Sequence, residues 1–279
     1  MKIFIIIPTF NRLECLKNLL LDIDRQKCNN VKLVKIVIDD CSTDGTSQYL
    51  DNCCDIISHR TKGNRWWPGA INDSIKFISE NMKVTNDDYI LLLNDDTRLP
   101  DSYINNVLHV AKHNPKACVG SMIHDAETGH LISVGALYDD SRLKIFDAIE
   151  VYGSNIHKTI EISLLSGRGS LFPAIEFLRY GLSNEFFTPQ YYADYLISNR
   201  FKKRGHYLLV DPSIYVLSDT DFGNMKKFSF LRKYFWKRSA NYVVARIFFD
   251  IFTMNRLLVI AYPMIIFTKF LRKVTKVII

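Results

Sequence analysis

The chain of 279 residues is long enough to bury a substantial core in one large domain or in a domain with an extension. Its 48% hydrophobic and 23% charged residues are ordinary for a globular protein, but the net charge of +7 is unevenly distributed. Residues 226–279 hold 12 of the 36 basic and one of the 29 acidic residues, which leaves 24 basic and 28 acidic residues in 1–225. This pattern argues against a nucleic-acid groove in the acidic body and for an anionic surface that meets the basic tail.

Strands and helices are predicted to alternate over the first hundred residues. The run from Ile3 to Ile7 consists of β-branched and aromatic residues, as expected of a parallel strand buried on both faces. Further strands are predicted at 34–38, 56–57 and 89–93, with helices over 13–23, up to Leu50 and over 66–78. The alternation predicts an α/β fold with a mainly parallel sheet that is flanked by helices on both faces.

Polar side chains collect where three of the predicted strands end. They are Thr9 and Asn11 after the first strand, Asp39 and Asp40 after the second, and Asp95 and Asp96 after the fourth. Sheets of this kind bind ligands at the carboxyl ends of their strands, so the convergence predicts a binding site. Strand-to-helix turns also favour Asp, Asn and Thr, but this structural explanation accounts for one such cluster more easily than for three.

The adjacent carboxylates of Asp95 and Asp96 form the candidate metal site. Mg²⁺ and Mn²⁺ prefer oxygen ligands and often take only one or two carboxylates, with water and substrate phosphates completing the coordination. The chain has neither a Gly-rich phosphate loop with its Lys nor a Gly-x-Gly-x-x-Gly turn after the first strand. A nucleotide diphosphate held through Mg²⁺ or Mn²⁺, rather than by a backbone cradle, fits this absence.

Four motifs occur in the order and spacing of a known family. They are PTFNR at residues 8–12, IDDCSTDGT at 38–46, GN at 63–64 with GAIN at 69–72, and LNDD at 93–96. Together they resemble glycosyltransferase family 2, although Asn94 stands where the family often has Asp. The resemblance implies a GT-A fold, with a nucleotide-binding sheet, a smaller mixed sheet on the acceptor side and, in this chain, a C-terminal helical tail.

The resemblance also assigns roles to residues of the donor side. Pro8 and Thr9 would line the pocket for the nucleotide base, and Asp40 would accept a hydrogen bond from the base. Asp95 would contact the ribose side, and Asp96 would be the direct metal ligand. The same motifs supply the other expected donor-binding residues, which are Asn11, Arg12, Asp39, Asn64 and Asn72.

The acceptor half resembles the family less strongly. The segment from Tyr191 to Arg200, followed by residues 203–207, is similar to the family's Glu-Asp-x-Asp-x-x-x-Arg segment and its Gly-Tyr end. Asp194 falls on the position of the general base, which would take a proton from the acceptor hydroxyl as that oxygen attacks the anomeric carbon. Such a single displacement inverts the anomeric configuration. The alternative is that Asp194 only caps the helix that carries Arg200.

The chain departs from the family pattern at two places. Ala193 replaces the acidic residue that usually precedes the base. Where relatives often carry a metal-binding His, this chain has LSDTD at residues 217–221, and Asp219 is the candidate oxygen ligand there.

Two short segments are candidates for the acceptor side of the site. Adjacent Trp66 and Trp67 point in different directions, so that one can line a cleft, where an aromatic face suits a sugar ring; both belonging to the core is the alternative. Gly167 would allow a substrate to approach closely and Arg168 would lie near the diphosphate, unless this segment is an ordinary turn.

The sequence from residue 226 onward is basic and apolar together. Its longest uncharged apolar run, residues 257–268, is shorter than the ~20 residues that span a bilayer. Basic amphipathic helices of this kind lie in the membrane interface, and the alternative is a helical subdomain packed on the body. We therefore expect a GT-A domain over 1–225, divided into a nucleotide-sugar part (1–100) and an acceptor part (101–225), and a basic amphipathic helical tail over 226–279.

These expectations combine into an inverting, metal-dependent glycosyltransferase of cell-surface polysaccharide synthesis. Its partners would be a nucleotide diphosphate-sugar and a glycan or lipid-linked acceptor, with no nucleic acid; a homodimer is left open. The six cysteines lack paired metal spacing, which favours reduced thiols and hence a cytoplasmic protein. The basic tail adds the expectation that it is held peripherally on the inner face of the cell membrane. The rivals are a non-catalytic nucleotide-sugar binding or assembly subunit and a sugar nucleotidyltransferase, which needs a Gly-rich, Arg-containing loop after the first strand.

Overall fold

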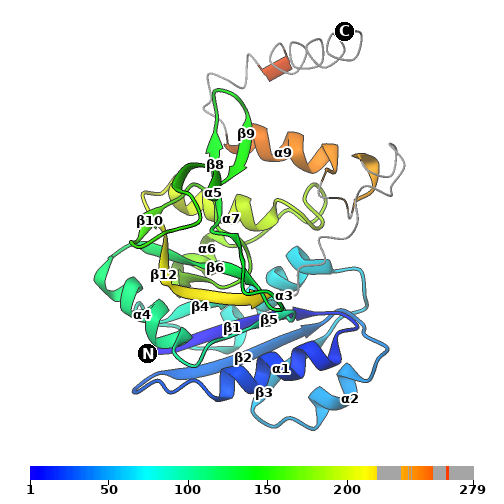
Figure 1. Ribbon diagram of the computed structural model, residues 1–279. Helices are drawn as coiled ribbons and strands as arrows, with labels where there is room; N and C mark the ends of the chain where they lie inside the picture. The colour runs from blue at the N-terminus through cyan, green and yellow to red at the C-terminus, as the bar shows by residue number, and fades with distance from the viewer. Residues whose placement is uncertain (219–233, 238, 240, 254–261, 264–279) are drawn as a thin grey trace.

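The first hundred residues alternate between strand and helix. The structure, a computed structural model, describes residues 1–218, 234–237, 239, 241–253 and 262–263 (Figure 1). Its first elements are β1 (Lys2–Thr9), α1 (Leu13–Asp24), β2 (Lys32–Asp39), α2 (Thr46–Asp51), β3 (Ile56–Arg60), α3 (Trp66–Asn81) and β4 (Tyr89–Leu92). β1 pairs in parallel with both β2 and β4, and β2 pairs in parallel with β3. The predicted parallel sheet is thereby confirmed.

The second half of the chain extends the same sheet. Its elements are β5 (Thr97–Arg98), α4 (Tyr103–His113), β6 (Ala117–Asp125), β7 (Leu131–Ser133), β8 (Ala136–Asp139), β9 (Lys144–Asp147), α5 (Ile149–Tyr152), β10 (Ile160–Glu161), β11 (Ser170–Pro173), α6 (Ala174–Tyr180), α7 (Ala193–Lys202) and β12 (Tyr207–Ser218). The strands lie in the order β10-β12-β6-β11-β4-β1-β2-β3, with β5 paired to β12 and β7 paired to β6. β11 runs antiparallel to β4 and β6, whereas β12 runs parallel to β6.

The predicted fold class is confirmed, with one difference in the acceptor half. The strands expected to form a smaller mixed sheet continue the main ten-stranded sheet instead. This happens because β11 pairs with the edge of β4 and thereby joins the two halves through backbone hydrogen bonds. The separate small sheet is the antiparallel pair of β8 and β9.

Two apolar layers explain why β1 is apolar from Ile3 to Ile7. Ile3, Ile5 and Ile7 belong to the core on the face covered by α1 and α4, whereas Phe4 and Ile6 belong to the core on the α3 face. All five side chains are fully buried. Because successive residues of a strand point to opposite faces, a strand covered on both faces has no position for a polar side chain. The first polar residues therefore follow at its carboxyl end.

Helix α9 (Val243–Thr253) lies in the predicted tail and packs on the body. Its Phe249 is fully buried and meets the ring of Tyr138 on β8 edge-on, with ring centroids 5.2 Å apart. On the same helix, the Arg246 Nε atom lies 3.0 Å from an oxygen of Asp250, which is also buried. In Figure 1 this helix lies beside the β8–β9 hairpin and α7. The packing matches the alternative of a helical subdomain on the body.

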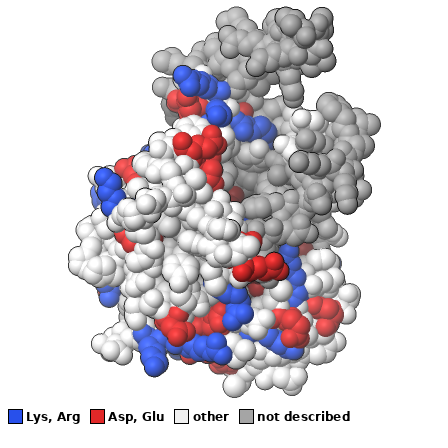
Figure 2. All heavy atoms as spheres, viewed as in Figure 1, with Lys and Arg blue, Asp and Glu red and all other residues white. Residues whose placement is uncertain are grey.

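The remaining expectations for the tail concern its boundary with the body and its contact with a membrane. The predicted boundary between residues 225 and 226 lies outside the described residues. No helix in the described part of the chain is long and apolar enough to cross a membrane. On the face shown in Figure 2, acidic and basic side chains of the described residues are interspersed rather than gathered by sign.

Candidate active site

A cleft of about 600 Å³ opens at the carboxyl ends of β1, β2 and β4. The residues that line it and that the sequence predicted are Pro8, Thr9, Arg12, Asp40, Asn64, Trp66, Trp67 and Asp95. A larger hollow of about 770 Å³ lies at the opposite ends of β1, β2 and β3, and its lining includes none of the predicted site residues. Parallel sheets bind ligands at the carboxyl ends of their strands, so we assign the site to the first cleft.

Asp95, which lines the cleft, and its neighbour Asp96 together meet three side chains. The Thr9 hydroxyl donates to Asp95 Oδ2 at 2.8 Å, and Arg12 Nη1 donates to Asp95 Oδ1 at 3.0 Å and to Asp96 Oδ2 at 2.9 Å. Arg168 Nη2 lies 3.5 Å from Asp96 Oδ2. Burial raises the pKa of Asp95, and the charge of Arg12 opposes that shift. The two carboxylates are therefore held in fixed positions by cations and a hydroxyl.

The oxygens of Asp96 fit a divalent cation. Asp96 Oδ1 is buried and has no hydrogen-bond partner among the described residues, which is costly for a carboxylate unless a ligand meets it. Within the described part of the chain, no group of three or more His, Cys, Asp or Glu residues could hold a metal. One or two carboxylates, completed by phosphate oxygens and water, are sufficient for Mg²⁺ or Mn²⁺. Asp219, the other predicted metal ligand, lies outside the described residues.

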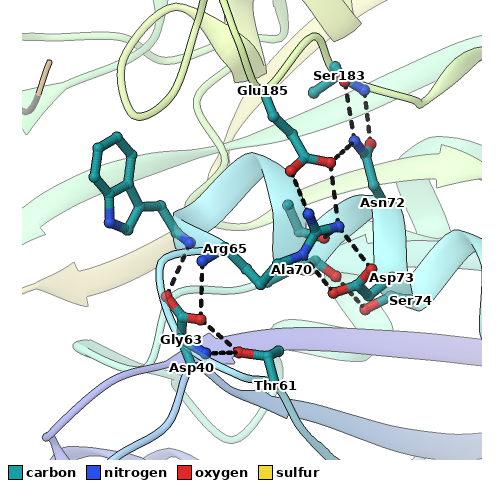
Figure 3. Close-up of polar contacts among 12 residues, drawn as sticks. Asp40, Thr61, Gly63, Arg65, Ala70, Asn72, Asp73, Ser74, Ser183 and Glu185 are labelled. Carbon is teal, nitrogen blue, oxygen red and sulfur yellow. Dashed lines mark hydrogen bonds and ion pairs between the residues drawn. The ribbon is translucent and has the colours of Figure 1, made fainter.

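Asp40 holds the start of α3. Its Oδ1 accepts hydrogen bonds from the Thr61 hydroxyl at 2.6 Å and from the Arg65 backbone N–H at 3.0 Å (Figure 3). Its Oδ2 accepts the Trp66 backbone N–H at 2.9 Å. A carboxylate oxygen has two lone pairs, so Oδ2 keeps the capacity to accept one further hydrogen bond from a ligand in the cleft.

Left-handed backbone shapes the turn between β3 and α3. The φ angles are +88° at Gly63, +63° at Asn64 and +52° at Trp66. Glycine adopts this conformation freely and asparagine tolerates it, but for a large aromatic residue it is strained. Such strain persists where the surrounding structure holds it, and here the Trp66 N–H is bound by Asp40. The turn thereby brings Asn64 and Trp66 to the wall of the cleft.

Trp67 connects the LNDD motif with the glycine turn of the acceptor half. Its indole N–H donates to Asn94 Oδ1 at 3.1 Å. A Cβ added to Gly167 would lie 2.5 Å from the Trp67 ring, so only glycine allows this ring to pack there. The backbone N–H of Gly167 in turn donates to Asp194 Oδ2 at 3.0 Å. Gly167 thus lies between the donor motif and the candidate base.

Asp194 is half-buried in the first turn of α7. Its Oδ1 accepts the backbone N–H of Tyr195 at 2.9 Å. The N-cap position itself belongs to Tyr192, and no side chain caps this helix. Burial raises the pKa of Asp194, while the hydrogen bond from Gly167 and the charge of Arg168 act in the opposite direction. A carboxylate with a raised pKa accepts a proton more readily than an exposed one.

Asp39 and Asn11 support the turn after β2 instead of lining the cleft. Asp39 is 1% exposed, and its carboxylate accepts the Ser42 N–H at 2.9 Å and the Ser47 hydroxyl at 2.5 Å. Asn11 Oδ1 accepts the Thr43 N–H at 2.7 Å. A strand that enters such a turn needs acceptors for the free N–H groups. This requirement explains why the structure does not bring these two predicted donor-binding residues to the cleft.

Asn72 is the third predicted donor-binding residue that does not line the cleft. Its Nδ2 donates to the Ser183 carbonyl at 3.0 Å and to Glu185 Oε1 at 2.7 Å, and its Oδ1 accepts the Ser183 N–H at 2.8 Å. The amide therefore ties α3 to the segment before α7. Asn72 lies on the side of α3 that faces this segment. Its amide can form all three hydrogen bonds only from that side of the helix.

Sequence reasoning missed Lys62, which lines the cleft, and three further polar residues around it. Gln190 lines the cleft, and Arg65 and Glu185 form an ion pair behind it. Arg65 stands between the motif residue Asn64 and the tryptophan pair, which was a usable signal. Glu185 and Gln190 belong to a segment in which no motif was recognised, so no comparable signal was available.

Comparisons with known proteins concern the family and the fold of the chain. The model of the family described as glycosyl transferase family 2 matches residues 4–158. A comparison with curated proteins found no match. Among solved structures, the chain is similar to GalNAc-T7 crystallised with UDP, GalNAc and Mn²⁺, with a TM-score of 0.59 and 11% identity over 78% of this chain and 43% of that chain. It is also similar to residues 1–349 of TarS from S. aureus, with a TM-score of 0.56 and 13% identity over 78% of this chain and 60% of that chain.

These likenesses have defined limits. TarS 1–349 in complex with UDP gives a TM-score of 0.54 at 14% identity, again over 78% of this chain and 60% of that chain. At such identities a structural likeness concerns the fold alone, and this chain spans 43% to 60% of those solved chains. The family match is broader evidence, because it covers more than half of this chain and includes every donor-side motif that meets at the cleft. The protein therefore belongs to glycosyl transferase family 2 and has the GT-A fold.

Proposed function

We propose that this protein is an inverting, metal-dependent glycosyltransferase that moves a sugar from a nucleotide diphosphate-sugar to a hydroxyl of a glycan or lipid-linked acceptor in cell-surface polysaccharide synthesis. The observation that carries the proposal is the short path between Asp96 and Asp194. Arg168 contacts Asp96, and its neighbour Gly167 donates to Asp194. The turn of Gly167 and Arg168 therefore connects two carboxylates. That of Asp96 suits a metal ion bound to a diphosphate, and that of Asp194 suits proton transfer.

The donor side of the cleft supports a nucleotide diphosphate. Pro8, Thr9 and Asn64 would surround the base, with Asp40 as an acceptor and Asp95 on the ribose side. The similar structures of GalNAc-T7 and TarS contain UDP, which agrees with such a donor.

Two cations of the chain face the place where the diphosphate would lie. Arg12 and Arg168 contact the carboxylate of Asp96, and a bidentate guanidinium suits phosphate oxygens. Mg²⁺ or Mn²⁺, held by Asp96 with Asp95 beside it, would neutralise the charge that develops on the departing diphosphate. Asp219 is the proposed further oxygen ligand.

Asp194 is proposed to receive the proton of the acceptor hydroxyl. The raised pKa of this carboxyl suits that task, because an efficient base titrates close to the working pH. The N–H of Gly167 holds the carboxylate in place beside the turn. Attack by the activated hydroxyl on the face opposite the diphosphate inverts the anomeric centre.

The acceptor would enter beside the tryptophans. Trp66 and Trp67 line the cleft, where an aromatic face suits a sugar ring. Gly167, followed by Arg168, packs against Trp67, and the absence of a side chain on Gly167 leaves room for the indole ring.

We also propose that the protein works in the cytoplasm, in peripheral contact with the inner face of the cell membrane. The 12 basic residues of 226–279 support this, since anionic lipid attracts them. Helix α9 packs on the body, yet its Ile251 and Phe252 are 39% and 56% exposed and could contact a lipid surface. A homodimer stays a prediction.

The activity test measures release of nucleoside diphosphate from a panel of UDP-, dTDP- and GDP-sugars with Mn²⁺. Asp96→Ala should lose metal-dependent donor binding, seen as loss of the ligand-induced rise in melting temperature. Asp194→Asn should bind the donor normally while turnover falls about 10²–10⁴-fold, the range that a general base contributes.

The control is Asp101→Ala, which removes an exposed carboxylate outside the cleft and should behave as the wild type. Normal turnover in Asp96→Ala would contradict the metal assignment. Donor binding without any turnover in the wild type, across the whole panel, would favour the non-catalytic binding subunit instead.

A further inference from the structure

Behind the cleft, one arginine joins two acidic side chains from different parts of the chain. Arg65 precedes α3, and its Nε and Nη2 donate to the two oxygens of Asp73 at 2.9 and 2.7 Å (Figure 3). Its Nη1 and Nη2 donate to the two oxygens of Glu185 at 2.6 and 3.2 Å. A guanidinium that meets two carboxylates in this paired way has a fixed orientation. We call these three residues and Asn72 the clamp.

Asn72 ties the clamp to the backbone of the 183–185 segment. Its amide donates to Glu185 Oε1 at 2.7 Å and exchanges hydrogen bonds with the Ser183 backbone at 3.0 and 2.8 Å. Figure 3 shows Asn72 and Ser183 facing each other beside the Glu185 carboxylate. The segment is therefore attached to α3 by side-chain and main-chain contacts together.

The clamp connects residues on two sides of the cleft. On the donor side, the backbone N–H groups of Arg65 and Trp66 bind the two oxygens of Asp40. On the other side, the segment after Glu185 leads through Gln190, which lines the cleft, into the first turn of α7. The position of Asp40 and the position of α7 are thus linked through one guanidinium.

Gly69 shows how closely the clamp is packed. A Cβ at this position would lie 3.0 Å from Arg65 Cβ and 3.0 Å from Glu185 Oε2. Such contacts are tighter than ordinary van der Waals distances. Glycine at this position therefore leaves room for the Arg65–Glu185 pair beside the helix. A methyl group there would press on both partners while leaving their charges unchanged.

Stability alone gives little reason for this arrangement. The side chains of Arg65 and Glu185 are 34% and 33% exposed, and partly exposed ion pairs contribute little to folding. Fixed geometry is the larger effect of a paired guanidinium, and a misplacement of about 1 Å between reacting groups can cost 10²-fold in rate.

We propose that Arg65 and Glu185 are positioning residues, which set the distance between the donor wall and the turn of α7 that carries the general base. This inference rests on the proposed function, in which Asp194 accepts the proton of the acceptor. Neither residue touches the reacting atoms. They act through Asp40 and Trp66 on one side and through the 185–193 segment on the other.

The test compares Glu185→Ala, Glu185→Gln and Gly69→Ala. Glu185→Ala should lower kcat about 10- to 100-fold, while the Kd for UDP with Mn²⁺, measured by titration calorimetry, changes less than about threefold. Glu185→Gln keeps a hydrogen-bond acceptor for Asn72 and Arg65 and should recover part of kcat. Gly69→Ala should lower kcat without removing any charge. The double variant Arg65→Gln with Glu185→Ala completes the test. Its kcat should be no lower than the kcat of Glu185→Ala alone or of Arg65→Gln alone.

Arg98→Ala is the matched control, because Arg98 binds Asp22 through Nε at 2.6 Å and Nη2 at 3.0 Å, in another paired contact on a different part of the chain. It should keep normal kcat. Equal kcat in Glu185→Ala and Arg98→Ala would overturn the proposal, and so would a loss of UDP binding in proportion to kcat.

A second measurement keeps this inference separate from the proposed function. Backbone hydrogen exchange over residues 181–195 should be faster in Glu185→Ala than in the wild type, whether or not transfer is detected. Wild-type protein without any transfer would contradict the proposed function, and the clamp would then be judged by exchange alone. Unchanged exchange in Glu185→Ala would overturn the clamp.

Discussion

At the scale of single residues, opposing effects set the chemistry of Asp194. Burial raises its pKa, and the N–H of Gly167 and the charge of Arg168 lower it. The carboxylate is therefore neither fully solvated nor paired as tightly as Asp95 is with Arg12. A carboxylate under such opposing effects is suited to take up a proton in a reaction.

The pH dependence of transfer should reveal this balance. Asp194 must be ionised to act, so kcat should fall as the pH falls through its raised pKa, at a midpoint above the ordinary carboxyl value of about 3.9. Arg168→Gln removes a charge that favours the ionised form and should move the midpoint to higher pH. Arg168→Lys keeps the charge and should leave the midpoint near that of the wild type. If the pH midpoint were the same in the wild type, Arg168→Gln and Arg168→Lys, the assignment of Asp194 as the base would be contradicted.

Single residues also show where a motif is sufficient and where it is not. The sequence placed Asp39 and Asp40 together at a strand end, and the structure separates them: Asp40 lines the cleft while Asp39 is buried under the turn. Asp39 is the last residue of β2, and because successive residues of a strand point to opposite faces, the two side chains point apart here. Spacing could predict the cluster, but the direction of each side chain depends on the turn that follows.

At the scale of elements, α9 shows how a basic and apolar segment can belong to the core. Phe249 packs with the aromatic residues Tyr138, Tyr192 and Tyr195. Asp250 is buried beside Arg246 and accepts a hydrogen bond from the Tyr138 hydroxyl at 3.3 Å. The same packing that holds α9 thus reaches residues on both sides of Asp194.

Asp250→Ala should weaken the attachment of this helix. It leaves the guanidinium of Arg246 without its carboxylate in a site where that side chain is 29% exposed, at a cost of about 1–3 kcal/mol in the free energy of unfolding. Urea denaturation would measure the loss, and hydrogen exchange should increase over residues 243–253. The double variant Arg246→Met with Asp250→Leu removes both charges and should recover much of the loss. A single variant as stable as the wild type would show that the pair does not hold α9.

The strands that were predicted and those that were not differ in a physical way. β1, β2 and β4 are apolar runs that local pattern can identify, because both of their faces are buried. The antiparallel insertion of β11 between β4 and β6 depends on pairing across distant parts of the chain. No local pattern encodes that neighbour, so a separate acceptor-side sheet was the natural expectation.

At the scale of the whole molecule, charge is divided along the chain. Residues 1–225 carry four more acidic than basic residues, whereas 226–279 hold 12 basic residues and one acidic residue. On the face shown in Figure 2, acidic and basic side chains of the described residues are interspersed. The separation of charge is therefore seen along the sequence and not on that face. An enzyme that acts on lipid-linked acceptors would benefit from a basic segment that keeps it at an anionic surface.

This division predicts binding to vesicles that contain anionic lipid. The protein should sediment with vesicles of phosphatidylglycerol and phosphatidylcholine but not with phosphatidylcholine alone, and salt should weaken the binding. Each basic residue near the surface contributes roughly 1 kcal/mol, so changing Lys226, Lys227, Arg232 and Lys233 to Gln should reduce the affinity up to about 10³-fold. The matched control changes four exposed lysines of the body to Gln, namely Lys27, Lys32, Lys76 and Lys112. Both variants lose the same net charge, so equal binding by the two would contradict a role for the tail and would leave only the overall charge as the attraction.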